Sequence, residues 1–508
     1  MTYYLTTPIY YVNSEPHVGH AYTTIAADIV VRNLRQRGED VFFLTGTDEH
    51  ASKVYRVAEQ QGLSAKEYVD RIVEESWRKL PARVGVEHDF FIRTTDPEHK
   101  AFVQDFVQRI HDNGHIYAGT YVGLYCVGCE EYKNESELVD GKCPIHEIEP
   151  EPLEERNWFF RLSAFQERLL ALYDESPELV VPSFRYNEAR RIIEGGLEDF
   201  SLSRQGQPWG VPIPWDPEQV TWVWVDALIN YLSALTYARP GEDLRERYWP
   251  EVRHLIGKDI LRLHCVLWPA LLLGAGYTVP KQIFAHGYLT LGDRKMSKSL
   301  GNVIPLDLVD EFGIDAVRFW AIRAVSFGQD GNVTLESVRE RYERELGNDL
   351  GNLLSRTTAM IARYREGRVR ECASAGSPVA ALLSGLADDV ASRIDRFDLS
   401  GALEQIWQVV RGLNRYVEAQ APWQLAKDEA RGEELDRTLY DLADGLRAVA
   451  VALAAFVPET SARILAALGS DPAGSSWDGV AYGRTGSLEG IEPAAPLFPR
   501  IDAPTAAA

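Results

Sequence analysis

Two short motifs far apart in the chain carry residues that suit ATP chemistry. The first is HVGH at residues 17–20, where a strand is expected to turn into a helix, and the second is KMSKS at residues 295–299. Imidazoles beside a glycine, together with two lysines on a polar loop, can hold a triphosphate and neutralise the charge that develops when ATP is split between its α- and β-phosphates. Each motif alone has an ordinary interpretation, a capped helix start or a solvated loop. Together, in this order, they predict one ATP-handling site.

The composition indicates a large protein of a reducing compartment. With 508 residues, of which 45% are hydrophobic, the chain is long enough for about three domains. It has no run of about 20 apolar residues and no basic-then-apolar leader at its start, so we expect a cytoplasmic protein without a membrane span. Five cysteines, three of them clustered, argue against a disulfide scaffold.

The charge is unevenly distributed. A net charge of −22 argues mildly against a nucleic-acid binder, because phosphate contacts need Lys and Arg. A local basic face can coexist with that excess, and eight arginines fall between residues 339 and 370. Glutamates alternate with them, so a helix with mixed surface charge is the alternative.

The N-terminal part has the pattern of a strand–helix–strand unit. Residues 3–7 and 41–45 are expected to be buried strands, and residues 18–37 a helix with an apolar stripe. Such a unit predicts a parallel sheet with crossover helices, in which ligands bind beyond the carboxyl ends of the strands. The histidines of the HVGH motif and Asp48 are expected at that edge.

The pattern changes twice farther along the chain. Residues 116–221 are irregular and rich in proline, and we interpret them as an insertion into the sheet. The sheet is expected to resume with strands at 220–225, 254–256 and 283–285. Helical periodicity dominates from about residue 339 to 468, and the last forty residues, rich in Gly, Ala and Pro, are expected to form a loose tail.

A cluster of potential metal ligands lies in the insertion, at Cys126, Cys129, Cys143 and His146. Each of its two pairs has two residues between its members, and 13 residues separate the pairs. Two such knuckles can wrap one tetrahedral zinc ion, and because protein would fill all four positions we expect a structural zinc. A chance grouping of buried cysteines is the alternative. Cys265 and Cys372 stand alone and are expected to be buried or incidental.

The HxGH and KMSKS motifs together are the signature of class I aminoacyl-tRNA synthetases, which the chain resembles, with valine at position 18 where isoleucine is usual. Over about residues 1–460 the chain is similar, in order and spacing, to the methionyl-tRNA synthetase family. The segments that carry this resemblance are PIYYVN at 8–13, GTDEH at 46–50, the single zinc knuckle pair, WVDAL at 224–228, and the run from GKDI at 257–260 to His264 and Trp268.

The resemblance implies an α/β fold, with a Rossmann-like parallel-sheet catalytic domain split by a zinc-binding insertion and followed by an α-helical bundle that binds the anticodon. The expected parts are the first half of the catalytic domain at 1–115, the connective insertion with the zinc knuckle at 116–221, the second half of the catalytic domain at 222–292, the KMSKS loop and stem-contact region at 293–340, the anticodon-binding domain at 341–470, and a C-terminal tail at 471–508.

The resemblance also implies methionine–tRNA ligase activity. ATP would activate L-methionine to methionyl-adenylate with release of pyrophosphate, and the 3′-terminal adenosine of initiator or elongator tRNA(Met) would then take the methionyl group. Magnesium is expected with ATP. Positioning and electrostatics should carry the first step, because little acid–base chemistry is needed in it.

A methionine site should be apolar and aromatic, because the side chain is flexible and only weakly polarisable at sulfur. In the family a tyrosine and a histidine approach the sulfur, and the residue matching Asp48 holds the α-amino group. Plain core packing is the alternative for the aromatic residues, and Leu228 stands at a position that varies among relatives. The expected methionine-binding residues are Ile9, Tyr11, Asp48, Trp224, Ala227, Leu228, Tyr231, Ile260, His264 and Trp268.

For ATP, the resemblance implies contacts from both signature motifs. The HVGH residues would meet the triphosphate and adenosine at a helix N-terminus, where exposed amides favour anions. Gly257 and Asp259 would hold ribose or adenosine groups, His286 would lie beside the adenine, and the lysines would close over the β- and γ-phosphates. The expected ATP-binding residues are His17, Gly19, His20, Gly257, Asp259, His286, Lys295 and Lys298, of which His17, His20, Lys295 and Lys298 are the catalytic candidates.

Asn348, Asn352 and Arg356 recur every four residues and share one helix face, which by default is a solvated face. In the family, residues matching Asn352 and Arg356 hydrogen-bond anticodon bases and one matching Trp423 stacks on a base, as in other recognition of single-stranded RNA. The implied anticodon is CAU. Because the chain ends soon after these helices, a monomer is expected.

Three rival classes of protein fit the sequence less well. Class I synthetases for valine, isoleucine or leucine are larger and carry an editing domain, whereas the insertion here is short. Small nucleotidylyltransferases share HxGH but lack a helical RNA-binding half. A non-catalytic RNA-binding paralogue should have lost a residue of the two signature motifs. Here all four are present, namely His17, His20, Lys295 and Lys298. How homocysteine would be rejected stays open, because one methylene is worth only about 1–3 kcal/mol in a hydrophobic pocket.

Overall fold

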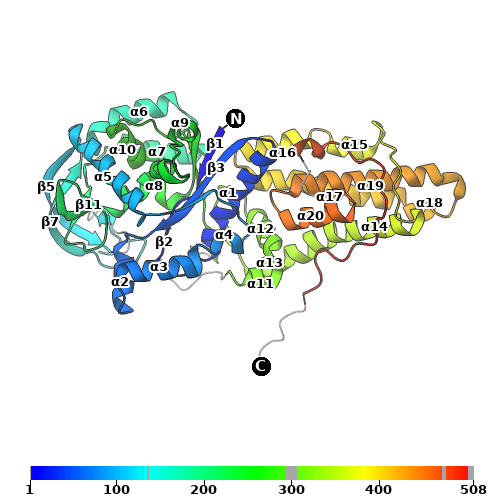
Figure 1. The fold of residues 1–508 in the computed structure, drawn as a ribbon, viewed down its shortest axis with the longest axis horizontal. Coiled ribbons are helices and arrows are strands. Elements are labelled where there is room, and N and C mark those ends of the chain that lie inside the picture. Colours follow the sequence, from blue (N-terminus) through cyan, green and yellow to red (C-terminus); the bar gives the residue numbers. More distant parts are fainter. Residues whose placement is uncertain are drawn as a thin grey trace.

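The computed structural model describes residues 2–127, 129, 131–133, 137–291, 294–295, 306–471 and 476–501. An α/β part surrounds a twisted sheet, and an elongated helical part lies beside it (Figure 1). Across these residues, no helix has both the length and the apolar character needed to cross a membrane.

The main sheet is parallel and, in the described ranges, has seven strands in the order β2-β3-β1-β13-β14-β8, with β4 paired to β3. The chain leaves β1 toward β3 on one side and returns to β13 on the other, so a topological switch point, where ligands bind, lies between β1 and β13. The strands are β1 (Thr2–Thr6), β2 (Tyr10–Tyr11), β3 (Asp40–Asp48), β4 (Phe90–Arg93), β8 (Val180–Val181), β13 (Val252–Gly257) and β14 (Gln282–His286). The expected parallel sheet with crossover helices is confirmed.

Helices pack against this sheet because its apolar strands need cover on both faces. The first of them, α1, follows β2 after a short loop and contacts β1, β3 and β13. The helices of this part are α1 (Val18–Gln36), α2 (Ser52–Gln60), α3 (Ala65–Ile72), η1 (Val73–Trp77), α4 (Leu80–Arg83), α5 (Pro97–Asp112), η3 (Leu162–Phe165), α6 (Gln166–Glu175), α7 (Ser183–Glu194), α8 (Val223–Tyr237), α9 (Arg245–Tyr248), η4 (Trp249–Glu251), η5 (Lys258–Ile260), η6 (Leu263–Leu267) and α10 (Trp268–Gly274).

The insertion forms two small sheets with antiparallel pairing. One has the order β6-β5-β7-β9 and the other β10-β12-β11. Their strands are β5 (Ile116–Cys126), β6 (Glu131–Lys133), β7 (Glu151–Phe160), β9 (Phe200–Ser201), β10 (Ser203–Gln205), β11 (Pro212–Ile213) and β12 (Asp216–Thr221). Strand β8, which lies between β7 and β9 in sequence, pairs with β14 of the main sheet instead.

The expected strand at 220–225 is wrong. Strand β12, which belongs to a small sheet of the insertion, ends at Thr221, and helix α8 begins at Val223. A short apolar run does not distinguish a buried strand from the start of a buried helix, and here the run continues into a helix of 15 residues. The other two expected strands correspond to β13 and β14.

A third small sheet, of order β16-β15-β17, follows the main sheet in sequence. It consists of β15 (Leu289–Leu291), β16 (Arg294–Lys295) and β17 (Gly331–Val333), with α11 (Leu308–Phe312) and α12 (Ile314–Arg323) between the last two. Lys295 therefore stands at the end of a strand that pairs with β15. Lys298 and the rest of the KMSKS loop lie outside the described residues.

Amphipathic helices build the second part, as the periodicity predicts. Two 22-residue helices, α17 and α19, lie side by side at its centre and bury a continuous row of apolar side chains. The helices are α13 (Leu335–Arg341), η8 (Tyr342–Gly351), α14 (Asn352–Arg365), α15 (Pro378–Leu383), α16 (Leu386–Asp395), α17 (Leu399–Gln420), α18 (Pro422–Leu425), η9 (Glu429–Arg431), α19 (Gly432–Leu453), α20 (Pro458–Ala467) and η11 (Trp477–Val480).

The expected loose tail is wrong for residues 476–501. Side chains of the helical part donate to its backbone carbonyls, with Tyr440 Oη 2.7 Å from the oxygen of Thr485 and Tyr342 Oη 2.7 Å from that of Pro499. Val369 and Leu488 form a β-bridge. A segment rich in Gly and Pro is ordered here because its neighbours satisfy its backbone, which composition alone does not reveal.

A buried arginine joins the two parts of the molecule. Arg318 on α12 is fully buried, and its Nη2 lies 2.7 Å from Asp28 Oδ2 on α1. It also donates to the carbonyl oxygens of Ala455 and Phe456, between α19 and α20, and of Gly85. A buried charge persists only when its donors are satisfied, so this side chain fixes α12 against both α1 and the helical part.

Candidate active site

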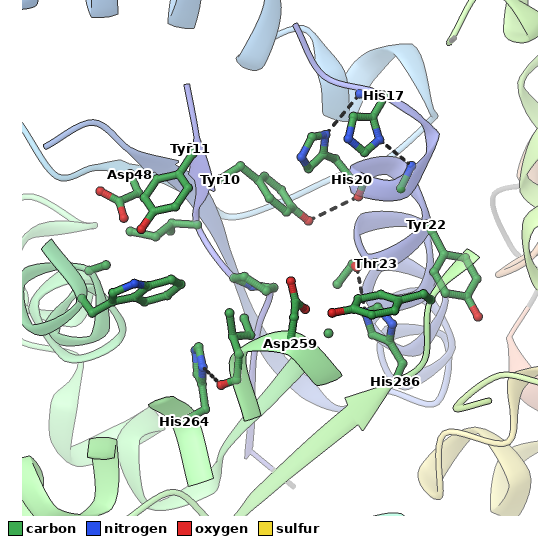
Figure 2. A pocket seen from close by; sticks show the side chains of 18 of the residues that line it. Tyr10, Tyr11, His17, His20, Tyr22, Thr23, Asp48, Asp259, His264 and His286 are labelled. Atoms are coloured by element: carbon green, nitrogen blue, oxygen red, sulfur yellow. Dashed lines mark hydrogen bonds between the residues drawn. The ribbon is translucent and has the colours of Figure 1, made fainter. Parts of the chain in front are cut away.

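A cavity of about 380 Å³ opens beyond the carboxyl ends of the central strands. Its walls come from β2, the N-terminus of α1, the end of β3, α8, η5 and the segment after β14. Figure 2 shows the two histidines of α1 on one side, Asp48 and Tyr11 on another, and His264 across from them. The site thus lies where the sheet topology predicts a ligand.

The HVGH motif forms the start of α1. His17 is the N-cap, its Nδ1 accepting from the main-chain N–H of Gly19 at 3.0 Å, and His20 Nδ1 accepts from the main-chain N–H of His17 at 3.1 Å (Figure 2). A Cβ at Gly19 would lie 2.9 Å from the His17 ring. The capped helix start is therefore real, and the same imidazoles also line the cavity.

An aromatic box supports His20. Its ring packs edge-on against Tyr10 and Trp77, with centroids 5.1 and 4.9 Å away, and the Tyr10 and Trp77 rings are stacked at 5.6 Å. The Tyr10 hydroxyl donates to the His20 carbonyl at 3.3 Å. Because these contacts come from β2 and η1, two neighbouring elements fix the orientation of the imidazole.

Asp48 and Tyr11 lie side by side, since β2 pairs with the last residues of β3. Asp48 is buried but lines the cavity. The Tyr11 ring meets Trp224 of α8 edge-on at 5.7 Å. This end of the cavity therefore offers one carboxylate beside aromatic and aliphatic surface.

Tyr231 and His264 form a hydrogen bond whose direction the neighbours decide. His264 Nδ1 lies 3.0 Å from the carbonyl oxygen of Ile260 and must carry the proton there. Burial lowers the pKa of His264 to about 4, so the ring is neutral and its Nε2 accepts from the Tyr231 hydroxyl at 2.7 Å. Because its only proton is donated to His264, the Tyr231 hydroxyl oxygen can act only as an acceptor toward any further partner.

The opposite end of the cavity is built from the ends of β13 and β14. Gly257 pairs with His286 in register, and Asp259 follows in η5. His286 Nδ1 donates to the carbonyl oxygen of Gly287 at 2.7 Å, so its Nε2 accepts from the Thr23 hydroxyl at 2.8 Å. Burial lowers the pKa of His286, which keeps this ring neutral as well.

The cavity brings together most of the residues predicted for methionine and ATP. Trp268 is not among its lining residues: it is buried behind Tyr231, its Nε1 donating to His254 Nε2 at 3.2 Å. Lys295 is described only as part of β16, and Lys298 lies outside the described residues. The predicted residues that line the cavity are Ile9, Tyr11, His17, Gly19, His20, Asp48, Trp224, Ala227, Leu228, Tyr231, Gly257, Asp259, Ile260, His264 and His286.

Sequence reasoning missed several lining residues. Three had a usable signal, because Tyr22 and Thr23 follow the HVGH motif within one helical turn and Tyr288 follows His286 by two residues. The others stand in β2, in β15 or in the loops beside these strands, and only the fold shows that they reach the cavity. The missed residues are Pro8, Tyr10, Asn13, Tyr22, Thr23, Gly287, Tyr288 and Leu289.

A buried carboxylate on α8 holds the wall that faces Asp48. Asp226 Oδ2 lies 2.6 Å from His50 Nδ1, and Asp226 Oδ1 lies 2.8 Å from His99 Nε2. Burial would raise the pKa of Asp226, but the two histidines outweigh it and lower this pKa to about 2. Three elements, the end of β3, α5 and α8, are thereby held together around the cavity.

The predicted metal ligands converge. The ligand atoms of Cys126, Cys129, Cys143 and His146 all lie within 4.8 Å of one another. Cys129 Sγ is 3.5 Å from Cys143 Sγ and 3.4 Å from His146 Nδ1. Tetrahedral zinc with Zn–S bonds of about 2.3 Å requires ligand atoms roughly 3.7 Å apart, so the donor set fits zinc. Cys265 is buried and Cys372 half-buried, both apart from this group.

A second predicted cluster lies on the helical part. Arg356 of α14 places its guanidinium 5.8 Å from the Trp423 ring of α18 and donates to Glu418 at 2.6 Å. Asn352 is exposed one turn away and donates to Asn348 at 3.4 Å. Figure 1 shows α18 at the end of the helical part farthest from the sheet. The three side chains could meet one ligand there, far from the cavity.

Most arginines between residues 339 and 370 are paired with carboxylates. The alternation of Arg and Glu in the sequence becomes pairs along and between helices, as the mixed-charge interpretation predicts. The paired arginines are Arg339, Arg341, Arg344, Arg356, Arg365 and Arg368.

Comparisons with known proteins agree with one another. The family model described as tRNA synthetases class I (M) matches residues 3–150 and 134–358. A methionine–tRNA ligase of Caldanaerobacter subterraneus subsp. tengcongensis is 43% identical over 506 residues, covering 99% of this chain and 79% of the relative. One of Streptomyces coelicolor is 43% identical over 526 residues, covering 99% of this chain and 98% of the relative.

A solved structure is similar over almost the whole chain. It is the Mycobacterium tuberculosis methionyl-tRNA synthetase in complex with methionyl-adenylate, with a TM-score of 0.93 and 38% sequence identity. The match covers 98% of this chain and all of that one. The similarity therefore includes both the sheet with its insertion and the helical part.

Proposed function

Because the chain belongs to the methionyl-tRNA synthetases, a family of class I tRNA synthetases, we propose that it activates L-methionine with ATP and transfers the methionyl group to tRNA(Met). The single observation that carries the proposal is the cavity, in which an aromatic end with one carboxylate adjoins a helix N-terminus with two imidazoles. One end suits an amino acid with an apolar side chain, and the other suits a nucleotide.

Methionine would lie between Asp48 and the Tyr231–His264 pair. The Asp48 carboxylate would accept from the α-ammonium group, a charge-assisted bond that also fixes the direction of the amino acid. The thioether would meet Tyr231 and the faces of Trp224 and Ile9, which supply polarisable and apolar surface. Trp268 would act through Tyr231, because it lies behind that ring.

ATP would lie across the N-terminus of α1. His17, Gly19 and His20 would meet its phosphates, and Gly19, which has no Cβ, would let the nucleotide approach the main chain closely. Gly257 and Asp259 would hold the ribose, and His286 would lie beside the adenine. A carboxylate oxygen of methionine would then attack the α-phosphorus, forming methionyl-adenylate as the bond to pyrophosphate breaks.

Charge stabilisation is the main task of the protein in this step. The developing charge on the leaving pyrophosphate would be met by His17, His20, Lys295 and Lys298, of which we place Lys298 first. Magnesium would accompany the phosphates of ATP and share this role. The 3′-terminal adenosine of the tRNA would then attack the carbonyl carbon of the adenylate, with AMP as the leaving group.

Zinc would be held by Cys126, Cys129, Cys143 and His146, a closed donor set with a structural role. The cavity takes no lining residue from this knuckle. The ion would tie the loop after β5 to the 139–146 segment and so shape the end of the insertion.

The anticodon would bind at the far end of the helical part. Asn352 and Arg356 would hydrogen-bond the bases of a CAU anticodon, and Trp423 would stack on one of them. Arg356 would exchange its partner Glu418 for RNA. We propose a cytoplasmic monomer that charges both initiator and elongator tRNA(Met).

The test is ATP–pyrophosphate exchange by the purified chain with each of the twenty amino acids, without tRNA. Exchange with methionine alone is the expected result. Exchange with another amino acid would keep the synthetase class and overturn the methionine pocket. No exchange with any amino acid, from folded protein loaded with zinc, would overturn the activation chemistry.

A further inference from the structure

A polar cluster lies where the small sheet that carries Lys295 meets the nucleotide end of the cavity. Its members are Lys258, Asp259, Tyr288 and Asp330. Asp259 and Tyr288 line the cavity, whereas Lys258 and Asp330 stand behind them. The mechanism above uses neither of these two, so their close association needs its own explanation.

Asp330 makes two hydrogen bonds to different parts of the site. Its Oδ1 accepts from the main-chain N–H of Tyr288 at 2.8 Å, and its Oδ2 accepts from Lys258 Nζ at 2.5 Å. The same Lys258 Nζ lies 4.6 Å from the centroid of the Tyr288 ring. One carboxylate thus links the residue before Asp259 to the segment after β14.

The turn that carries Asp330 is packed against Gly287 with no room to spare. A Cβ at Gly287 would lie 2.3 Å from the carbonyl carbon of Gln329 and 2.5 Å from the nitrogen of Asp330. The main-chain N–H of Gly331 donates to the Tyr288 carbonyl at 2.9 Å. This packing places the Asp330 turn directly beside His286, the residue expected at the adenine.

The small sheet of β16, β15 and β17 connects the Asp330 turn to the strand that bears Lys295. Gly331 begins β17, which pairs in parallel with β15, and β15 pairs with β16 so that Thr290 stands opposite Lys295. The Thr290 hydroxyl also donates to the Gly331 carbonyl at 3.1 Å. A shift of the Asp330 turn would therefore move the strand that bears Lys295.

Stability alone is a poor explanation for the Lys258–Asp330 pair. The Asp330 side chain is 49% exposed and that of Lys258 24% exposed, and ion pairs open to solvent add little to folding because water screens them. Partial burial raises the pKa of Asp330, but the bond from Lys258 outweighs it and lowers this pKa, so the carboxylate is charged at neutral pH. The importance of the Lys258–Asp330 pair must therefore come from its position beside the nucleotide end of the cavity.

We propose that Asp330 is a positioning residue for adenylate formation: bonded to Lys258 and to the main chain of Tyr288, it holds the strands that carry Lys295 against the nucleotide end of the cavity. Asp330 touches no reacting atom in this scheme. It acts by setting the position of the strand that ends at Lys295, and a displaced strand would present this lysine to the leaving pyrophosphate less well. The inference rests on the proposed function.

Two substitutions separate the two bonds of Asp330. Asp330→Asn keeps an oxygen for the Tyr288 N–H but loses the charge that binds Lys258, and Asp330→Ala loses both. In methionine-dependent ATP–pyrophosphate exchange by the full chain, we expect Asp330→Ala to lower kcat about tenfold or more, because small misplacements of catalytic groups cost up to about 10²-fold. Asp330→Asn should fall between Asp330→Ala and wild type. The KM for methionine should stay within about twofold, since the amino-acid end is untouched.

A matched control is an ion pair at the amino ends of β13 and β14, the two strands whose carboxyl ends lead to Lys258 and Tyr288. Lys281 Nζ lies 2.5 Å from Glu251 Oε2 near the amino ends of β13 and β14, and both side chains are partly exposed. Lys281→Met removes an equivalent ion pair far from the cavity and should leave kcat unchanged. Lys258→Met should match Asp330→Asn, because each loses only the bond between Lys258 and Asp330. The double variant Lys258→Met/Asp330→Ala should match Asp330→Ala, because residues acting as one unit lose their effect only once.

The outcomes are distinct. A fall in kcat at constant KM for methionine, with a melting temperature no lower than that of Lys281→Met, supports the positioning role. Wild-type kcat in Asp330→Ala, or an equal loss in Lys281→Met, overturns it. Full additivity of Lys258→Met and Asp330→Ala overturns the link between the two residues. Wild-type protein without methionine-dependent exchange overturns the proposed function instead.

Discussion

At the scale of single residues, the site is governed by which hydrogen-bond partners its buried polar groups have. His264 and His286 each donate from Nδ1 to a main-chain carbonyl, which leaves Nε2 as an acceptor for Tyr231 and Thr23 respectively. Both rings are therefore fixed in one tautomer and kept neutral. The Tyr231 hydroxyl donates its proton to His264, so its oxygen can only accept a hydrogen bond from a ligand.

Tyr231→Phe tests this arrangement. It leaves His264 Nε2 buried without its donor, at a cost of about 1–3 kcal/mol in unfolding free energy, and it should raise the KM for methionine severalfold while leaving the KM for ATP unchanged. Tyr173→Phe is the matched control, since Tyr173 is also buried and donates to the Cys265 carbonyl at 2.7 Å away from the cavity. A rise in the methionine KM in both variants would contradict a specific role of Tyr231.

The neutral histidines also predict a pH dependence of stability. The pKa of His264 is about 4 in the folded chain and about 6.5 in the unfolded chain, so its contribution to stability is complete above pH 6.5 and is lost as pH falls toward 4. The slope should approach about 1.4 kcal/mol per pH unit for this residue. Asp226, with a pKa of about 2, adds a loss only below its unfolded value near 3.8.

Urea unfolding at pH 7, 6 and 5 checks the histidine effect. His264→Gln, which can still bond the Tyr231 hydroxyl and the Ile260 carbonyl, should show a shallower fall in stability across this range. An unchanged slope in the variant would mean that His264 does not drive the dependence.

At the scale of elements, helix and strand ends bring the chemistry together. The N-terminus of α1, the ends of β3, β13 and β14, and one face of α8 all meet at the cavity. Buried links such as Asp226 with His50 and His99 hold these ends in place. The zinc knuckle is a separate element, with ligands at the end of β5, just after this strand and on the 139–146 segment.

Removal of the knuckle's thiolates should abolish metal binding. Purified wild-type chain should carry about one zinc ion, and Cys143→Ser should lose it because a hydroxyl is a poor ligand for this ion. Elemental analysis measures the content, and limited proteolysis should show new cleavage confined to the insertion. Cys372→Ser is the control and should keep its zinc; equal zinc content in Cys143→Ser and wild type would contradict the site.

At the scale of the whole molecule, the two candidate sites lie in different parts of the chain, and the buried Arg318 side chain connects these parts. The cavity belongs to the α/β part, and the Asn352–Arg356–Trp423 cluster lies at the far end of the helical part (Figure 1). Arg318 binds α12 to α1 and to the turn between α19 and α20. Because α1 begins at the HVGH motif, this connection fixes the helical part relative to the side of the cavity that the start of α1 forms.

The separation predicts that single substitutions split the two functions. Lys298→Ala should lower methionine-dependent exchange by about 10²–10³-fold, the loss seen when one charge-stabilising donor is removed, with tRNA affinity unchanged. Trp423→Ala should weaken tRNA binding by about 1–3 kcal/mol, the value of one stacked base, with exchange unchanged. Filter binding and pyrophosphate exchange measure the two effects, and equal loss of both in each variant would refute the assignment.

Local patterns in the sequence predicted the elements that depend on local physics. The period of apolar residues gave β1, α1, β13 and β14 nearly to the residue, and the Cys and His spacing gave the donor set that converges in the structure. The HVGH motif pointed to the cavity, because its two histidines stand at the N-terminus of α1, where they cap the helix and also line the cavity. The methionine assignment came from resemblance, since no local rule distinguishes a ligand-binding aromatic from one in the core.

Only the tertiary structure decided what depends on contacts between distant segments. The run after residue 219 became the end of a small strand and the start of α8, because the helix had a buried place to occupy. Trp268 proved to stand behind the cavity, and residues 476–501 proved to be bound along the helical part. The sequence by itself determined the inventory of reactive groups; packing determined which of them share a cavity, because that is set by partners hundreds of residues away.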